Sequence, residues 1–486
     1  MTNNQNDNTS IKSKTRLAIY WDSISKFSNQ GISFFFSIIL ARLLSPSDYG
    51  IIALPMVFLA VAQCFINSGF SAALIRKPVI TDEDLDTAFI FNLIVGVLFY
   101  VLLFFASPLI ADFYNIPILK ELLRVSALST IFTPLQSVQY VLLNRNLNYK
   151  TPAIIAIISN LTTGLVGIVL AYNGLGVWAL VFQGVAGQCV SLLLIWWLIS
   201  WKPSFHWSSS SFHYLFGFGS KIMASGLIDA LYDNIYPVVI GKYYNTKDLG
   251  LYNRSLGYAK LPFNQINGML DSISYPVLSK IQDDENKLTY SYLRFLRLNL
   301  FVLCPIMLGL SALAYPLVVI MITDKWVDCV PLLEIICFPI IFWPIQTLNF
   351  TILKVKGRSD VMLKLNIGIK LLGVLVLIFI IPHGLKAIGW GYVIHALLAL
   401  SWTLYFTGKV TNISVFMQVK EMIPISLLGL GMYFVIRISM MFFSSLYLQL
   451  FVGSISGILF YILLAFIFRF PEVDDVKYLF HVKQNN

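Results

Sequence analysis

Long apolar segments recur along almost the whole chain, and short polar segments separate them. About twenty apolar residues cross the hydrocarbon core of a bilayer as one helix, and windows of that length predict about fourteen spans. The predicted spans cover residues 17–44, 48–72, 88–107, 118–144, 151–172, 175–200, 214–243, 247–279, 292–321, 330–354, 361–382, 387–409, 421–443 and 446–468. The polar segments between them are too short for a separate soluble domain. The pattern therefore predicts an all-α, polytopic membrane protein.

The composition agrees with a chain that faces lipid over most of its area. Hydrophobic residues make up 57% of the sequence and charged residues 12%, whereas a soluble domain carries about 25% charged residues. The five cysteines form no CxxC pair and no Cys/His cluster, so we expect neither a disulfide nor a metal site, and no cofactor. No cleavable signal peptide is recognisable, and the first span is expected to direct insertion.

The net charge of +10 first suggests nucleic-acid binding. The Lys and Arg residues, however, lie in short segments between spans and favour one side of the membrane by about three to one. The few on the other side are Arg42, Lys120, Arg124, Lys242, Lys247, Lys325 and Lys386. The positive-inside rule therefore predicts that both termini lie in the cytoplasm, and no nucleic-acid partner is expected.

A motif recurs after about two hundred residues. ARLLSPSDYGI (41–51) ends the first span and opens the second, and GKYYNTKDLGL (241–251) does the same for the seventh and eighth. Both copies have a basic residue, two large apolar residues, a short turn and Asp-x-Gly-apolar. We expect the Asp near the helix start and the following Gly to let the chain turn and re-enter the membrane.

Further pairs keep nearly the same offset: Pro134 with Pro344, Gly174 with Gly384, and Trp178 with Trp390. With six spans in each unit, the halves are expected to be parallel repeats about an axis normal to the membrane. The predicted units are an N-terminal six-helix lobe (1–205), a C-terminal six-helix lobe (206–412), and two additional helices with a cytoplasmic tail (413–486). The alternative is shared helix-turn chemistry without common ancestry.

Polar residues gather in three predicted spans. A charge near mid-bilayer costs about 2.5–3.5 kcal/mol even on the lenient insertion scale, so such residues face protein, water or cargo. The first span carries Asp22, Lys26, Asn29 and Gln30; the seventh carries Lys221, Asp229 and Asp233; the eighth carries Arg254, Lys260, Asn264, Asn267 and Asp271. Steps of three and four residues place many of them on one helix face.

Two interpretations of these residues stay open. In the functional one, the four cations bind an anionic cargo head group together with the amides, and the four carboxylates serve ion coupling or pair with cations. In the structural one, Asp22 pairs with Lys26, and Lys221 pairs with Ser225 or Asp229. Because buried ion pairs alone add little net stability, the functional interpretation is favoured for the set as a whole.

Other polar positions are interpreted as structural. His395 stands alone on an apolar helix and is expected to be a packing residue, and Arg437 is expected to reach the interface or a neighbouring helix. Lys370 is either a cavity residue or reaches the interface. The acidic run at 82–86 is expected to be a solvated loop and helix start. No Walker, HExxH or GxSxG motif is present, and we expect no enzymatic activity.

Several of these segments resemble the polysaccharide-exporter flippases of bacteria, in the Wzx-type branch that includes the colanic acid and teichuronic acid exporters. The similar segments are LARLLSPSDYG (40–50), SGFSAALI (68–75), LYNR (251–254), LPFNQI (261–266) and YPVLS (275–279). The resemblance covers residues 15–410. It implies the fold of the multidrug/oligosaccharidyl-lipid/polysaccharide exporter superfamily, with two six-helix lobes in a V and two terminal helices.

The resemblance also implies a function. The expected cargo is an undecaprenyl-diphosphate-linked oligosaccharide, flipped from the cytoplasmic to the outer leaflet of the bacterial cytoplasmic (inner) membrane for O-antigen, capsule or exopolysaccharide assembly. The role of engaging the diphosphate is carried over to Lys26, Lys221, Arg254 and Lys260 by helix position. A polysaccharide polymerase and co-polymerase are expected partners. The alternatives are a drug or small-molecule antiporter of the same fold, a lipid II flippase, and a membrane oligosaccharide polymerase or ligase.

Overall fold

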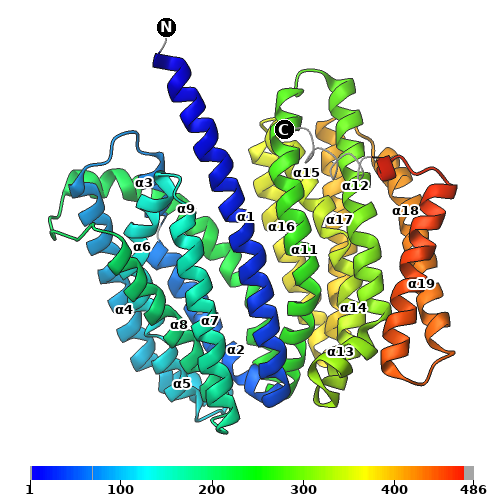
Figure 1. The fold of residues 1–486 in the computed structure, drawn as a ribbon, viewed down its shortest axis with the longest axis horizontal. Helices are drawn as coiled ribbons and strands as arrows, with labels where there is room; N and C mark the ends of the chain where they lie inside the picture. Colours follow the sequence, from blue (N-terminus) through cyan, green and yellow to red (C-terminus); the bar gives the residue numbers. More distant parts are fainter. Residues whose placement is uncertain (1–2, 68, 475–486) are drawn as a thin grey trace. The chain divides into compact units, whose positions relative to one another are not determined.

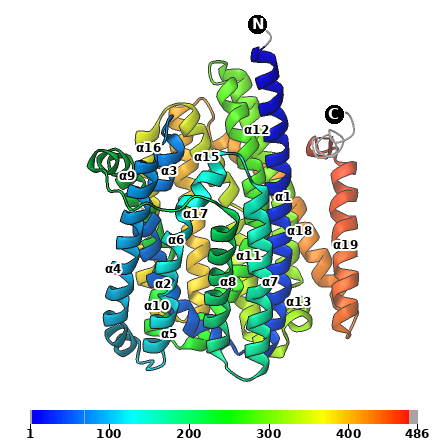
Figure 2. The same cartoon turned by 60° about the vertical axis from the view of Figure 1, so that its left-hand side comes forward.

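Each predicted span coincides with one helix or with two consecutive helices in the computed structural model, which describes residues 3–67 and 69–474 (Figures 1 and 2). The first helices are α1 (Asn3–Leu43), α2 (Pro46–Asn67), α3 (Phe70–Arg76), α4 (Asp82–Tyr114), α5 (Leu119–Ser126), α6 (Ser129–Arg145), α7 (Lys150–Tyr172), α8 (Val177–Leu198), α9 (Ser209–Asp233), α10 (Ile235–Tyr243) and α11 (Thr246–Lys280). The remainder are α12 (Glu285–Ala312), α13 (Ala314–Ile322), η1 (Asp324–Cys329), α14 (Val330–Ile340), α15 (Trp343–Val355), α16 (Ser359–Ile380), η2 (Ile381–His383), α17 (Leu385–Val410), α18 (Val415–Met440) and α19 (Leu446–Ile467).

Ten helical segments within the described residues are long and apolar enough to cross a membrane, so the chain is a multi-pass membrane protein. The segments are Pro46–Arg76, Asp82–Tyr114, Lys150–Tyr172, Val177–Leu198, Glu285–Ala312, Asp324–Val355, Ser359–His383, Leu385–Val410, Val415–Met440 and Leu446–Ile467. The other predicted spans are helical but more polar, as in α1, α9 and α11, or are divided, as in α5 and α6. The count of fourteen stays a prediction.

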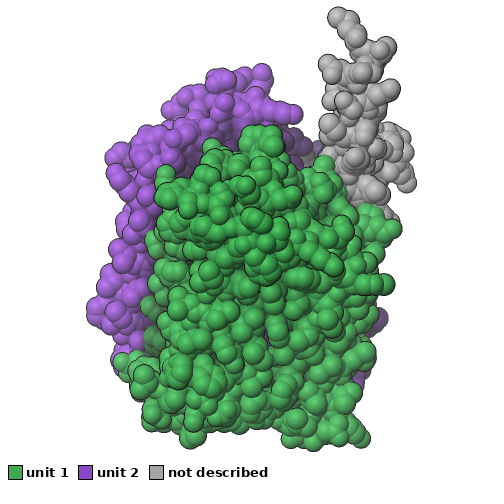
Figure 3. Space-filling model, turned by 90° about the vertical axis from the view of Figure 1, so that its left-hand side faces the viewer, with its two compact units in different colours: residues 1–250 green, residues 251–486 purple. Residues whose placement is uncertain are grey.

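The chain forms two compact units, residues 1–250 and 251–486 (Figure 3). The first unit includes α9 and α10, because α9 packs on α2, α3 and α4 and α10 packs on α2. In the second unit α18 packs on α12, and α19 packs on α18 and α13. The lobe boundaries predicted at 205/206 and 412/413 from the repeat stay a prediction.

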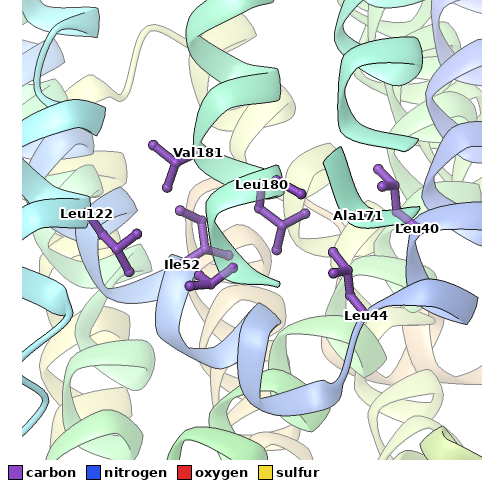
Figure 4. Packing of buried hydrophobic residues seen from close by; sticks show 9 residues of the cluster. Leu40, Leu44, Ile52, Leu122, Ala171, Leu180 and Val181 are labelled. Atoms are coloured by element: carbon purple, nitrogen blue, oxygen red, sulfur yellow. The ribbon is translucent and has the colours of Figure 1, made fainter. Parts of the chain in front are cut away.

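The core of the first unit is built from aliphatic residues where α1, α2, α7 and α8 meet. Leu40, Leu44, Ile52 and Leu180 are almost completely buried and pack together (Figure 4). Burying each of these side chains contributes about 1.5–3 kcal/mol in water, but in lipid the same contacts act through close packing. α1 lies along α7 over much of its length (Figures 1 and 2).

Glycines allow close backbone contact within the first unit, between the start of α2 and the first residues of α11. A Cβ on Gly50 would stand 1.7 Å from the carbonyl oxygen of Thr246, and a Cβ on Gly250 would stand 1.8 Å from that of Pro46. Both glycines lie inside helices and neither has a positive φ. The expectation that they let the chain turn is therefore wrong: their role is the close approach of α2 and α11, as in small-residue contacts of membrane helices.

The turns of the repeated motif are made by other residues. Asp48 accepts hydrogen bonds from the backbone N–H of Ser45 at 2.9 Å and from its hydroxyl at 2.7 Å, while Ser45 Oγ accepts from Asp48 N. This capping box starts α2. In the second copy Asn245 Oδ1 accepts from Asp248 N at 2.8 Å. The expected helix start at each Asp is thus present, with the cap supplied three residues earlier.

The acidic run at the start of α4 is only partly solvated, so the expectation of a solvated loop is wrong for Asp84 and Asp86. Both are buried. Asp84 forms a capping box with Thr81 and an ion pair with Lys77 at 2.7 Å. Asp86 accepts hydrogen bonds from Ser204 N at 3.1 Å, Ser204 Oγ at 2.6 Å and His206 N at 3.4 Å. These two carboxylates are buried because donors satisfy them.

The polar side chains expected to be structural in the second unit have protein partners. His395 Nε2 lies 3.0 Å from the carbonyl oxygen of Ile369, so the packing interpretation of His395 is confirmed. Arg437 of α18 forms an ion pair with Glu334 of α14 at 3.2 Å, which confirms the predicted inter-helix contact. Lys370 is half-buried on α16, and its role stays open.

Candidate functional site

The charged stripe predicted on the seventh span lies on α9. Lys221, Asp229 and Asp233 are exposed in the structure, although a lipid-facing charge at this depth would be costly. Within residues 3–67 and 69–474, Lys221 has neither a hydrogen bond nor an ion pair, so a bridge from Lys221 to Ser225 or Asp229 is not formed. Because α9 uses its other face to pack on α2, α3 and α4, this exposed face is available to water or cargo.

The polar residues of the first span divide between two environments on α1. Lys26 is exposed. Asn29 instead faces α7, where its Oδ1 accepts a hydrogen bond from Asn160 Nδ2 at 2.8 Å, and its own Nδ2 donates to Ser25 Oγ at 3.0 Å. Gln30 is half-buried. Asn29 therefore takes part in the contact between α1 and α7, and an interhelical amide pair of this kind stabilises packing in a membrane.

The cations of α11 lie on aromatic rings in the second unit. The guanidinium of Arg254 lies 5.2 Å from the ring centre of Tyr258 and 5.4 Å from that of Trp326. The ammonium of Lys260 lies 5.5 Å from the ring centre of Trp343. Aromatic faces attract cations and fix their position while leaving the charge able to bind an anion. Both side chains are half-buried.

The amides of α11 have different surroundings. Asn264 is exposed. Asn267 lines a small cavity of about 10 Å³, together with Asn299 of α12 and Thr347 of α15. That volume holds no more than about one water molecule, so Asn267 does not line a cargo-sized cavity there. The side chains of Asp22 and Asp271 lie outside the described part of the structure.

The predicted site residues thus fall into two groups, one in each unit. Their partners Asn160, Trp326 and Trp343 were not predicted from the sequence, because each lies on a helix distant in sequence from the residue it contacts. A signal existed only for Tyr258, which follows Arg254 by four residues and therefore lies on the same face of α11. In the described residues no group of three or more His, Cys, Asp or Glu side chains could hold a metal ion.

The model of one protein family, described as polysaccharide biosynthesis protein, matches residues 39–331. The chain belongs to this family. The matched region runs from the end of α1 to the start of α14, and it includes all the described polar residues of α9 and α11 considered above. It also includes both copies of the repeated Asp-x-Gly motif.

Curated relatives of this polysaccharide biosynthesis family protein carry names of the same kind. The teichuronic acid biosynthesis protein TuaB of Bacillus subtilis (strain 168) is 27% identical over 74% of this chain and 75% of its own length. The lipopolysaccharide biosynthesis protein WzxC of Escherichia coli (strain K12) is 23% identical over 74% of this chain and 73% of its own length. The succinoglycan biosynthesis transport protein ExoT of Rhizobium meliloti (strain 1021) is 26% identical over 65% of this chain and 64% of its own length.

Solved structures of known transporters share the fold. The lipid II flippase MurJ, in an inward closed conformation, matches 93% of this family member and 98% of its own chain, with a TM-score of 0.73 and 21% identity. An inward-facing multidrug resistance MATE family transporter of the MOP superfamily matches 81% of this chain and 98% of its own chain, with a TM-score of 0.60 and 17% identity. The fold expected from the sequence, that of the multidrug/oligosaccharidyl-lipid/polysaccharide exporter superfamily, is therefore confirmed.

Proposed function

We propose that this protein flips undecaprenyl-diphosphate-linked oligosaccharide repeat units from the cytoplasmic to the outer leaflet of the bacterial cytoplasmic membrane. The observation that carries the proposal is the family match over residues 39–331, on a chain with many membrane-spanning helices. The repeat units feed the assembly of a surface polysaccharide such as O-antigen, capsule or exopolysaccharide. Both termini lie in the cytoplasm, as the distribution of Lys and Arg indicates.

The physical task explains why charges occur in membrane helices. A diphosphate with several sugars cannot cross hydrocarbon unaided, because its polar groups would lose their hydrogen bonds to water. The polyprenyl tail can remain in lipid throughout. Polar side chains on α1, α9 and α11 therefore need to replace only the hydrogen bonds that the diphosphate and sugars make with water.

We assign the diphosphate to Lys26, Lys221, Arg254 and Lys260, as their positions on α1, α9 and α11 suggest. The exposed amide of Asn264 and the half-buried Gln30 and Asn267 are assigned to the sugars. Asn29 is assigned mainly to helix packing, since Asn160 already uses its side-chain oxygen. Spread cations held on aromatic rings favour binding that is firm enough to load and weak enough to release.

The carboxylates Asp229 and Asp233 lie on the same exposed stripe of α9 as Lys221. We assign them, with Asp22 and Asp271, to ion coupling or to pairing with cations when no cargo is bound. Transport then proceeds by alternating access, with the two predicted six-helix lobes rocking about the cargo. The protein acts as a transporter without a catalytic step, and a polymerase and co-polymerase receive the flipped units.

The proposal is tested in a deletion strain that has no second flippase for the same glycan. Lipid-linked repeat units should accumulate on the cytoplasmic side, and the surface polysaccharide should be lost. Expression of the intact chain should restore both. Normal surface polysaccharide in the deletion strain would show that the protein does not carry out this step.

The assignment of the cations is tested separately in the same strain. Lys26→Ala, Lys221→Ala and Arg254→Ala should each lower export at unchanged protein level, and Lys221→Arg should retain more export than Lys221→Ala. Lys202→Ala, in the polar segment before α9, serves as the control. If all three alanine variants export normally, the cations do not bind the diphosphate.

A further inference from the structure

A large cavity in the second unit lies away from the residues assigned to the cargo. It has a volume of about 610 Å³, and α12, α18, α19 and the segment after α19 line it. Ligand pockets in proteins are typically about 300–1,000 Å³. Its walls are apolar over α18 and α19, with Leu428, Phe460 and Leu464 among them, and its polar end is formed by Arg297, Glu421, Arg469 and Glu472.

The charges at the polar end are not fully satisfied by one another. Arg297 donates a hydrogen bond to Glu421 Oε2 at 2.9 Å, and its Nε lies 2.7 Å from Glu472 Oε1. The second carboxylate oxygen of Glu472, Oε2, is buried and accepts no hydrogen bond from any described residue. One guanidinium thus serves two carboxylates, and Glu472 still requires a donor.

Arg469 supplies a positive charge to the same pocket. It follows the C-terminus of α19 with a φ of 51°, is exposed, and forms no ion pair with a described residue. The backbone bond from Phe470 N to Ala465 O at 3.0 Å closes a Schellman motif around it. Glycine is the usual residue at such a position, so an arginine there adopts a strained backbone conformation. The pocket therefore combines an available cation, a buried carboxylate with one oxygen that lacks a donor, and an apolar wall.

We propose that this pocket binds a phospholipid that carries a primary amine, with the chemistry of phosphatidylethanolamine. Its phosphate binds Arg469, its ammonium donates hydrogen bonds to Glu472, and an acyl chain lies along Leu428, Phe460 and Leu464. An ammonium offers three donors, one of which can satisfy the buried Oε2 of Glu472. A membrane supplies this lipid directly to a pocket that reaches the end of a spanning helix.

Three lipids with the same dioleoyl chains separate the parts of this proposal. Phosphatidylcholine keeps the phosphate and the positive charge but has no N–H donor, and phosphatidylglycerol keeps the phosphate without a cation. The full-length protein in detergent is titrated with each lipid, and bound lipid is counted by native mass spectrometry. Phosphatidylethanolamine should bind about tenfold more tightly than either of the others, as expected for hydrogen bonds to a charged group.

Variants locate the site. Arg469→Gly removes the cation at a position that glycine adopts easily, so it should weaken phosphatidylethanolamine binding without loss of thermal stability. Leu464→Trp should fill the pocket and weaken binding of all three lipids, whereas Leu463→Trp, on the exposed neighbouring position, should not. Glu472→Gln should abolish the preference for phosphatidylethanolamine over phosphatidylcholine.

The outcomes decide the proposal whether or not Glu472→Gln folds, because Arg469→Gly and Leu464→Trp leave the contact between Arg297 and Glu472 unchanged. Equal binding of the three lipids would overturn head-group recognition, and tighter binding of phosphatidylglycerol would show a general anionic-lipid site instead. Unchanged binding in both Arg469→Gly and Leu464→Trp would show that the lipid lies elsewhere. None of these measurements depends on export, so the proposed transport function stands or fails separately.

Discussion

Gly50 and Gly250 face each other reciprocally: each lies against the carbonyl of the residue that stands four positions before the other. A Cβ on Gly50 would stand 3.0 Å from Gly250 N, and a Cβ on Gly250 would stand 3.1 Å from Gly50 N. The same two positions were paired by the repeated sequence motif. The two copies of that motif therefore meet in the structure, where α2 and α11 begin.

Gly250→Ala should destabilise the protein because its Cβ would overlap a backbone carbonyl that cannot move like a side chain. Overpacking of this kind costs about 1–3 kcal/mol, and a clear fall in melting temperature in detergent is expected. Gly257→Ala is the matched control on the same helix, since nothing lies within 4 Å of its Cβ. It should melt at or above the wild-type temperature. Equal melting of the two variants would contradict the close contact.

The ring of Tyr258 should matter for transport more than its hydroxyl does. Arg254 lies over this ring at 5.2 Å, and a cation–π contact contributes about 0.5–2 kcal/mol. We expect Tyr258→Leu to lower the rate at which lipid-linked repeat units are flipped in membrane vesicles by up to about tenfold. Tyr258→Phe should retain the wild-type rate. If the two variants behave alike, the ring does not position Arg254.

Asp86 should protect the segment between α8 and α9 from proteolysis. Its carboxylate accepts hydrogen bonds from Ser204 and from His206 N, and each bond to a charged group is worth about 1.5–3 kcal/mol. Asp86→Asn should therefore speed chymotrypsin cleavage after Phe205, which is 65% exposed. Asp82→Asn, at an exposed position on the same turn of α4, should leave the cleavage rate unchanged. Unaltered cleavage in Asp86→Asn would show that other contacts hold this segment.

Tyr292 joins three helices in the core of the second unit. Its hydroxyl lies 3.0 Å from Asn349 Oδ1 and 2.7 Å from Gln418 Oε1, and all three side chains are buried. The hydroxyl has one proton to donate to these two oxygens, so Tyr292→Phe leaves a buried amide oxygen without its donor and should cost about 1–3 kcal/mol of stability. The melting temperature in detergent measures the effect. Tyr290→Phe, 64% exposed, should melt like the wild type, and the same result for Tyr292→Phe would exclude a stabilising role for the network.

The helices could be predicted from the sequence because each span needs a long apolar run to satisfy its backbone within lipid. The breaks inside spans were harder to predict. Residues 127–128 separate α5 from α6, although the nearest proline, Pro134, lies several residues further on. At this break α6 packs closely on α4: a Cβ on Gly96 of α4 would stand 2.3 Å from Thr130 O. Such contacts depend on neighbours distant in sequence.

The candidate site could be predicted only at the level of helix faces. Spacing placed Lys221, Asp229 and Asp233 on one stripe of α9, and all three are exposed. Spacing could not show that Lys26 is exposed while Asn29 packs against α7, because the position of Asn29 depends on its hydrogen bond with Asn160 of α7. It also misjudged Asp86, which looks like a solvated charge until Ser204, more than a hundred residues later, supplies the donors.

The contact of Arg254 with the ring of Trp326 should make the fluorescence of this tryptophan sensitive to the position of Arg254. Trp326 is fully buried, with its indole 5.4 Å from the guanidinium, and a charge so close to an indole alters the energy of its excited state. An anion that draws Arg254 away removes that charge from the ring. A variant that keeps Trp326 as its single tryptophan thus contains a native fluorophore beside the cation, and its emission would follow loading and release without an attached dye.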